Sequence, residues 1–228
     1  KSIPASPGGG TVAYVNPESH RYLEGPEHRE EGGTPAIIES VRAGMVFQLK
    51  QAVTEKVIHE REEGFVRRAI DKWSAVPNLK ILGDLESQRL SIISFVIEFK
   101  GRHLHHEFVV ALLNDLFGIQ ARGGCSCAGP YGHRLLDIDL DMSKKFDTEI
   151  QNGCEILKPG WVRVNFNYFI SEEVFEYILD AVAWLAQNGS WFLGQYDYKI
   201  DSSAWVHKEK TTIEVSSLED LSYQGGAL

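Results

Sequence analysis

The segment Leu90–Phe99 is the feature that most limits how this chain can fold. Its sequence, LSIISFVIEF, is apolar at most positions on both faces of an extended strand. A strand that is apolar on both faces is typical of the interior of a sheet covered by other elements. We therefore expect Leu90–Phe99 to have neighbours on both sides and not to form the edge of a sheet.

Helical and extended patterns alternate along the rest of the chain, which predicts an α/β fold. Thr34 is expected to be the N-cap of a helix with Pro35 at its first position, and Thr54 to cap a second helix that runs to about Ala75. The other elements expected are strands at Leu79–Leu82, Ile119–Arg122 and Trp161–Phe169 and helices at Leu104–Phe117 and Ser171–Gln187, closed or capped by Gly118 and Ser171.

The segment after Gly189 is rich in aromatic residues. Side chains of this size bury well, so we expect this segment to pack across the body of the protein. The residues concerned are Trp191, Phe192, Tyr196, Tyr198 and Trp205.

Composition excludes several classes of function. The chain has 228 residues, 43% hydrophobic residues and a formal net charge of −9, so it can form a packed core but offers no basic surface for nucleic acid. No apolar run is long enough to cross a bilayer, and no membrane partner is expected. Three cysteines do not make a disulfide scaffold, which favours a reducing compartment and predicts a cytoplasmic protein.

Two thiols lie on a glycine-rich loop, Arg122–Pro130, directly after a predicted strand. Glycines allow a sharp turn that leaves a side chain exposed, so Cys125 and Cys127 are candidates for a reactive thiol. Nearby positive charge favours the thiolate, and Arg122 and His133 are the candidate sources. A metal clip and an incidental loop are the alternatives.

Four motifs follow one another along the chain. They are Gly8–Gly10, Arg29–Pro35, the loop Arg122–Pro130, and Trp161–Phe166 before a final helix. In this order they resemble the C-terminal half of the class V aminotransferase family of pyridoxal-phosphate enzymes, and the cysteine loop is similar to that of the cysteine desulfurases within the family. The resemblance implies a small C-terminal domain with a largely antiparallel sheet covered by helices.

The resemblance also assigns roles to single residues. It implies that Cys127 is the thiol that attacks substrate sulfur, and that Arg163 grips the α-carboxylate of a small amino-acid substrate, which a planar guanidinium suits. It implies that Thr34 contacts the cofactor phosphate of the neighbouring subunit in a homodimer. The alternatives are that Thr34 is only a helix cap and that Arg163 belongs to an ion pair.

Pyridoxal 5'-phosphate is the cofactor that the resemblance implies. In the family, the Schiff-base lysine precedes the triple glycine, so we expect this chain to be the C-terminal part of a longer enzyme and to be inactive alone. The expected organisation is a remnant of the large domain with a linking helix over residues 1–50, the small domain over 51–188 and an aromatic extension over 189–228.

Other interpretations remain open. Cys125 departs from the desulfurase pattern, and it could resolve a persulfide, form a strained disulfide or have no role. An aminotransferase or lyase of the same family would use the cysteine loop differently. A separate interaction or metal-binding module would draw on the histidines at 103, 105 and 106 and on the cysteines, but their spacing is not that of a zinc knuckle, and no metal is predicted.

Overall fold

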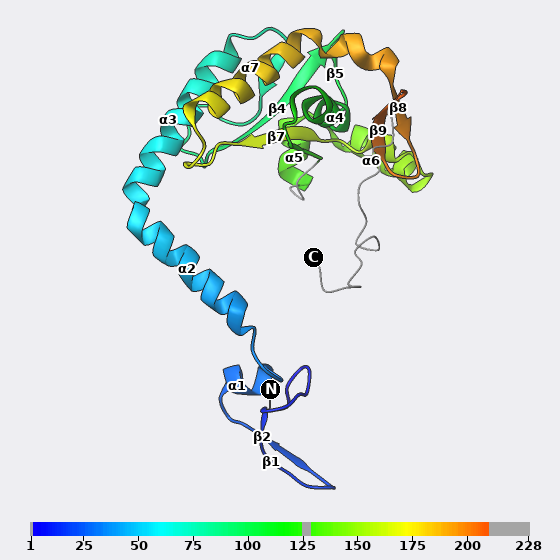
Figure 1. The fold of residues 1–228 in the computed structure, drawn as a ribbon. Coiled ribbons are helices and arrows are strands. Elements are labelled where there is room, and N and C mark those ends of the chain that lie inside the picture. Colours follow the sequence, from blue (N-terminus) through cyan, green and yellow to red (C-terminus); the bar gives the residue numbers. More distant parts are fainter. Residues whose placement is uncertain (1, 125–128, 210–228) are drawn as a thin grey trace, which may run out of the picture. The chain divides into compact units, whose positions relative to one another are not determined.

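The computed structural model describes residues 2–124 and 129–209, and Figure 1 shows the course of the chain. The chain divides into two compact units, Lys1–Ile58 and His59–Leu228, and each is described by itself below. Among the described residues, no helix is both long and apolar enough to cross a membrane.

The first unit contains a short hairpin and helices. Strands β1 (Val12–Val15) and β2 (His20–Tyr22) pair antiparallel, and α1 (Pro26–Glu30) and α2 (Ile37–Val53) follow. Helix α2 buries no side chain within this structure, and its apolar residues are exposed.

The start of α2 differs from the prediction. Its N-cap is Ala36 and its first residue is Ile37, so Thr34 is not the cap and Pro35 is not in the first turn. The carbonyl oxygen of Ala36 accepts hydrogen bonds from both the backbone N–H and the hydroxyl of Ser40, at 2.9 and 2.8 Å. These bonds fix the first helical turn two residues later than the Thr-Pro pattern indicates.

The second unit is built on an antiparallel sheet with the strand order β3-β4-β7-β6. Strand β4 (Ile92–Phe99) lies between β3 (Leu79–Ile81) and β7 (Trp161–Asn165), which confirms that it is an interior strand. The short strands β5 (Arg102–His103) and β6 (Arg122–Gly124) pair with β4 and β7.

Three helices cover one face of this sheet and form the main core (Figure 1). They are α3 (Glu55–Ser74), α4 (His106–Phe117) and α7 (Glu172–Asn188). Their aromatic and aliphatic side chains pack against inward residues of β4 and β7, and Trp73 at the centre donates its indole N–H to the carbonyl of Leu179 at 3.1 Å. The predicted α/β class, with a largely antiparallel sheet covered by helices, is confirmed.

The opposite face of the sheet is only partly covered. Helix α5 (Gly129–Leu135) follows the thiol loop and packs near Trp161, where Gly132 leaves room for the indole ring. A small second cluster of Leu82, Val96 and Trp161 lies here. The remaining elements on the way to β7 are α6 (Leu140–Gln151) and a 3-10 turn, η1 (Glu155–Leu157).

Most predicted boundaries in the second unit lie within two residues of the observed ones, but two strands are shorter than predicted. The strand predicted at Trp161–Phe169 ends at Asn165. Gly118 ends α4 in a left-handed conformation and Ser171 caps α7 through a hydrogen bond from the backbone N–H of Val174, as expected. The strand expected at Ile119–Arg122 begins only at Arg122, because the N–H of Ile119 bonds to the carbonyl of Leu113 and completes the end of α4.

The chain after α7 packs on the second unit as a 3-10 segment, η2 (Gly189–Gln195), and a hairpin of β8 (Tyr196–Lys199) and β9 (Ala204–His207). Tyr196 is buried in the main core, and Phe192 and Trp205 pack against it. Trp191, in contrast, is 71% exposed, so the expected packing does not extend to it.

Candidate functional site

A row of polar side chains crosses the less covered face of the sheet. Arg163 on β7 lies directly opposite Arg122 on β6, and on its other side it lies opposite Ser94 on β4. Paired residues on antiparallel strands point to the same face. Because Val162 and Val164 point into the core, Arg163 points away from it, together with its two partners.

The side chains of Arg122 and Arg163, which carry like charges, start from directly opposite positions on the two strands. Like charges directly opposite each other destabilise a strand pair. Among the residues that the structure describes, no carboxylate lies within ion-pair distance of Arg122 or Arg163. A bound anion would supply the missing negative charge, so this part of the sheet is a candidate anion site.

Two hollows open at Arg163. One, of about 530 Å³, is lined by both arginines and by the amides of Gln120, Asn165 and Asn167. The carboxylate of Glu62 also lines it and accepts a hydrogen bond from the backbone N–H of Tyr168 at 3.2 Å.

The second hollow, of about 470 Å³, is lined by Arg163, Ser94, Tyr131 and Arg89, among others. One nitrogen of the Arg89 guanidinium donates to the carbonyl of Asp84, which holds the loop before β4. Arg163 is half-buried between the two hollows, with space for a ligand about the size of an amino acid on either side.

The two candidate thiols, Cys125 and Cys127, lie outside the described residues. The residues on either side of them are described: β6 ends at Gly124, whose φ of 115° favours glycine, and α5 begins at Gly129. His133 bonds through Nδ1 to the carbonyl of Gly129 at 2.8 Å and through Nε2 to the hydroxyl of Ser143 at 2.8 Å. Both of its ring nitrogens are therefore engaged beside this loop.

The first two motifs of the resemblance meet in the first unit. The backbone N–H of Gly33 bonds to the carbonyl of Gly9 at 2.8 Å, and a Cβ on Gly8 would lie only 2.8 Å from the Cα of Gly32. Thr34 follows this contact, exposed. Thr34 thus lies in the first unit, whereas Arg122 and Arg163 lie in the second.

The described residues include no group of three or more histidine, cysteine, aspartate or glutamate side chains placed to hold a metal ion. His105 uses both of its ring nitrogens in hydrogen bonds within the protein, and Cys154 is an exposed free thiol. Cys125 and Cys127, on which the metal-binding module considered above would also draw, lie outside the described residues.

The sequence profile of the class-V aminotransferases matches residues 1–172, which is most of the chain. This chain belongs to the class-V aminotransferase family. The match includes Thr34, the thiol loop and Arg163, and pyridoxal phosphate is the cofactor expected of this family.

Among curated proteins, the chain is similar to two probable cysteine desulfurases. The protein from Halobacterium salinarum is 24% identical over 139 residues, which are 61% of this chain and 32% of that protein. The protein from Streptomyces coelicolor is 28% identical over 124 residues, which are 54% of this chain and 28% of that protein. The matched region therefore spans about a third of these relatives.

Solved structures give the same relationship. A cysteine desulfurase from Thermococcus onnurineus NA1 matches with a TM-score of 0.59 and 25% identity, over 81% of this chain and 40% of that one. The Escherichia coli cysteine desulfurase CsdA matches with a TM-score of 0.58 and 20% identity, over 81% of this chain and 39% of that one. These matches confirm the expected small-domain fold of a transferase that uses pyridoxal phosphate.

Sequence reasoning found Arg163 and Arg122 separately but missed that they face each other. It also missed Ser94, which has no motif of its own. The pairing depends on the register between β6 and β7, and the short, glycine-rich β6 carries little pattern from which that register could be read.

Proposed function

We propose that this chain forms the part of a cysteine desulfurase that binds the carboxylate of a small amino-acid substrate, L-cysteine, and carries the thiol that receives its sulfur. The observation that supports this most is that Arg122 and Arg163 lie opposite each other on the less covered face of the sheet, with no ion-pair partner among the described residues. The family match and the similarity to probable cysteine desulfurases support the reaction class.

In this proposal Arg163 binds the substrate's α-carboxylate. Its half-buried position limits competition from water, and a guanidinium offers two parallel N–H donors to the two carboxylate oxygens. Arg122 lies opposite Arg163, on β6, the strand that precedes Cys125 and Cys127 in the chain. It adds positive charge on that side of Arg163. The neighbouring amides of Asn165 and Asn167 supply further donors around the same hollow.

One residue of the first unit, Thr34, is suited to bind the phosphate of the cofactor. The hydroxyl of Thr34 is exposed and has no hydrogen-bond partner among the described residues, so it is available to donate to a phosphate. When bound, pyridoxal phosphate withdraws electrons from the substrate's α-carbon. In this proposal Thr34 would hold the phosphate of the cofactor in the site of a second subunit.

The sulfur step is carried by Cys127, in the loop between Gly124 and Gly129. Its thiolate forms a bond to the sulfur of the substrate, and the bond between that sulfur and the β-carbon breaks. The electron pair of the broken bond stays with the carbon fragment, which takes up one proton and leaves as alanine. Cys127 then holds the sulfur as a persulfide, and atoms and electrons balance without a further oxidant.

The assignment is tested on the native polypeptide, by which we mean the longest polypeptide that the native source makes. The reaction products are analysed after pyridoxal phosphate and L-cysteine are supplied. We expect alanine and sulfane sulfur in equal amounts, and we expect Cys127→Ala to stop both while the cofactor's absorption is retained. Cys154→Ala, at an exposed cysteine on another loop, is the matched control and should keep activity. Release of pyruvate and ammonia instead of alanine would assign a lyase and reject the proposal.

A further inference from the structure

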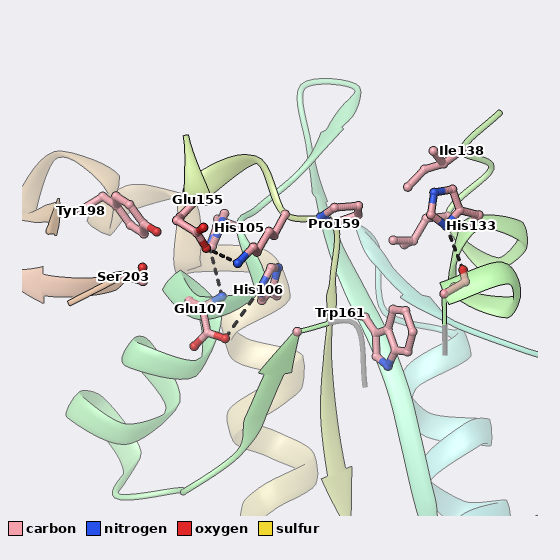
Figure 2. Close-up of a pocket in the computed structure, with 15 residues that line it drawn as sticks. His105, His106, Glu107, His133, Ile138, Glu155, Pro159, Trp161, Tyr198 and Ser203 are labelled. Atoms are coloured by element: carbon pink, nitrogen blue, oxygen red, sulfur yellow. Dashed lines mark hydrogen bonds and ion pairs between the residues drawn. The ribbon is translucent and has the colours of Figure 1, made fainter. Parts of the chain in front are cut away.

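A separate cavity of about 510 Å³ lies between the start of α4 and helix α5. Figure 2 shows His105, His106 and Glu107 on one side of it and Trp161 and His133 on the other. Gly124 and Gly129, which bracket the loop, also line it. We call it the His106 cavity, and neither Arg122 nor Arg163 is among its lining residues.

Histidines form one wall of the His106 cavity, and they differ in the hydrogen bonds that their ring nitrogens make. His105 accepts at Nδ1 from the indole N–H of Trp205 and from the backbone N–H of Glu107, so its proton is on Nε2, which donates to the carbonyl of Ile156. His106 stacks on His105 with ring centroids 4.4 Å apart. It is 9% exposed, and among the described residues its ring nitrogens have no hydrogen-bond partner.

Glu107 gives the cavity an uncompensated negative charge. Burial, with a smaller contribution from His105, lowers the pKa of His106 to about 4, so His106 is neutral at pH 7 although its Nε2 lies 3.7 Å from Glu107. Burial also raises the pKa of Glu107, and among the described residues no lysine or arginine lies within ion-pair distance of its carboxylate. The other glutamate in the lining, Glu155, is already paired with Lys158.

A second polar group is buried without a partner. Trp161, at 4% exposure, lines the cavity, and its indole N–H has no acceptor among the described residues. Nearby positions are packed so closely that only glycine fits: a Cβ on Gly160 would lie 2.7 Å from the His106 ring. The cavity is thus a tightly built space in which His106, Glu107 and Trp161 all retain hydrogen-bonding capacity.

Tyr198 and Ser203, from the β8–β9 hairpin, form part of the wall of the cavity (Figure 2). The family match ends at residue 172, so this wall comes from a segment outside the matched region. Tyr198 is held by edge contacts to His105 and Trp205, with ring centroids 6.0 and 5.8 Å apart. The cavity is therefore shaped in part by a feature of this chain that the family pattern does not include.

We propose that the His106 cavity binds a small organic ammonium ion, with its apolar body among the aromatic side chains and its charged nitrogen at Glu107. The carboxylate of Glu107 and the free ring nitrogen of His106 can accept hydrogen bonds from an N–H-bearing cation, and the aromatic side chains bury its apolar body. An anion is disfavoured because the one free charge of the described lining is negative. This binding goes beyond the proposed desulfurase activity and does not depend on it.

Binding of three probes to the 228-residue chain tests the proposal. The probes are benzylamine, which is an ammonium ion at pH 7, benzyl alcohol, which is neutral, and benzoate, which is an anion with the same ring. The Trp161 indole N–H signal, assigned in nitrogen-15 NMR spectra with Trp161→Phe, reports on the cavity itself. We expect benzylamine to shift this signal saturably and to bind at least about tenfold more tightly than benzyl alcohol, with no shift from benzoate.

Charge variants identify the residue responsible. Glu107→Gln should lower the affinity for benzylamine to that for benzyl alcohol, whereas Glu149→Gln, at an exposed site on α6, should leave it unchanged. The proposal is overturned if the Trp161 signal does not move, if benzyl alcohol or benzoate binds as tightly as benzylamine, or if Glu107→Gln binds benzylamine like the wild type. The probe series alone decides the matter if the variant does not fold.

Discussion

Arg122 and Arg163 lie directly opposite each other on the adjacent strands β6 and β7, and no described carboxylate is paired with either. Two positive charges in this arrangement raise the free energy of the folded chain. A carboxylate that binds between or beside the two guanidinium groups would offset the repulsion between them, which gives a physical reason for the pairing. The same geometry leads to predictions about stability and about substrate binding.

Removing one charge of the pair should stabilise the chain without ligand. We expect Arg122→Gln to raise the free energy of unfolding by about 0.2–1 kcal/mol at low ionic strength. The gain should shrink in 0.5 M NaCl, because salt screens charges that are exposed to solvent. Urea denaturation at both salt concentrations measures this, with Arg134→Gln on α5 as the control; equal effects of the two substitutions would mean that the pair does not repel.

Arg163→Lys should impair substrate binding more than turnover. Lysine keeps the charge but loses the planar fork, so we expect the KM for L-cysteine to rise about tenfold or more in the native polypeptide with its cofactor. The ratio of KM values for the variant and the wild type is the measurement. Arg134→Lys is the matched control, and an unchanged KM in Arg163→Lys would remove Arg163 from the carboxylate site.

The proposed homodimer makes Thr34 and Arg163 of different subunits partners in one site. Thr34→Ala and Arg163→Ala should then each be impaired, while a mixed dimer of the two variants contains one site with both native residues. Random reassortment of equal amounts should restore up to about a quarter of wild-type activity. Activity that stays at the level of the separate variants would place Thr34 and Arg163 in the same subunit's site or show that Thr34 has no role.

His106 should make stability depend on pH. Its pKa is about 4 in the folded chain, whereas the ordinary value of 6.5 applies in the unfolded chain. Between pH 4 and 6.5, the unfolded chain therefore binds a proton that the folded chain does not. Stability should therefore fall as the pH falls from 6.5 to 4, by an amount on the order of 3 kcal/mol from this residue.

The difference in unfolding free energy between the wild type and His106→Gln isolates this contribution, since the other titrating groups are common to both. We expect the difference to change across pH 4–6.5 and to be constant above pH 7. His59→Gln, at a largely exposed histidine on α3, is the matched control. A constant difference over the whole range would mean that His106 is not buried as described.

Much of the fold could be predicted because local patterns and tertiary packing agree. The apolar run at Leu90–Phe99 becomes the interior strand β4, and the caps Gly118 and Ser171 end and begin the helices as expected. The predicted start of α2 was wrong. The first hydrogen bonds of the helix are accepted by the carbonyl of Ala36, and the side chain of Thr34 does not cap it. A motif of a few residues does not show which of several neighbouring residues will begin the helix.

The site was predictable in its residues but not in its arrangement. Arg163 and Arg122 could be named from motifs, yet their pairing depends on the register of β6, a strand with two glycines. The His106 cavity had no signal of its own, because its walls come from α4, α5, β7 and the β8–β9 hairpin, which are far apart in sequence. The assignment of Cys127 rests on its motif alone, and the domain boundaries at residues 50 and 188 stay predictions.

The most direct test is the visible absorption spectrum of the native polypeptide with pyridoxal phosphate, recorded before and after adding L-cysteine or cysteamine. Cysteamine has the amine and thiol of cysteine but lacks the carboxylate. We expect the cofactor band to shift with L-cysteine at concentrations at least about tenfold lower than with cysteamine, and Arg163→Lys to reduce this difference in concentration. An absent cofactor band, or equal responses to the two compounds in the wild type, would mean that this protein does not bind L-cysteine through its carboxylate as proposed.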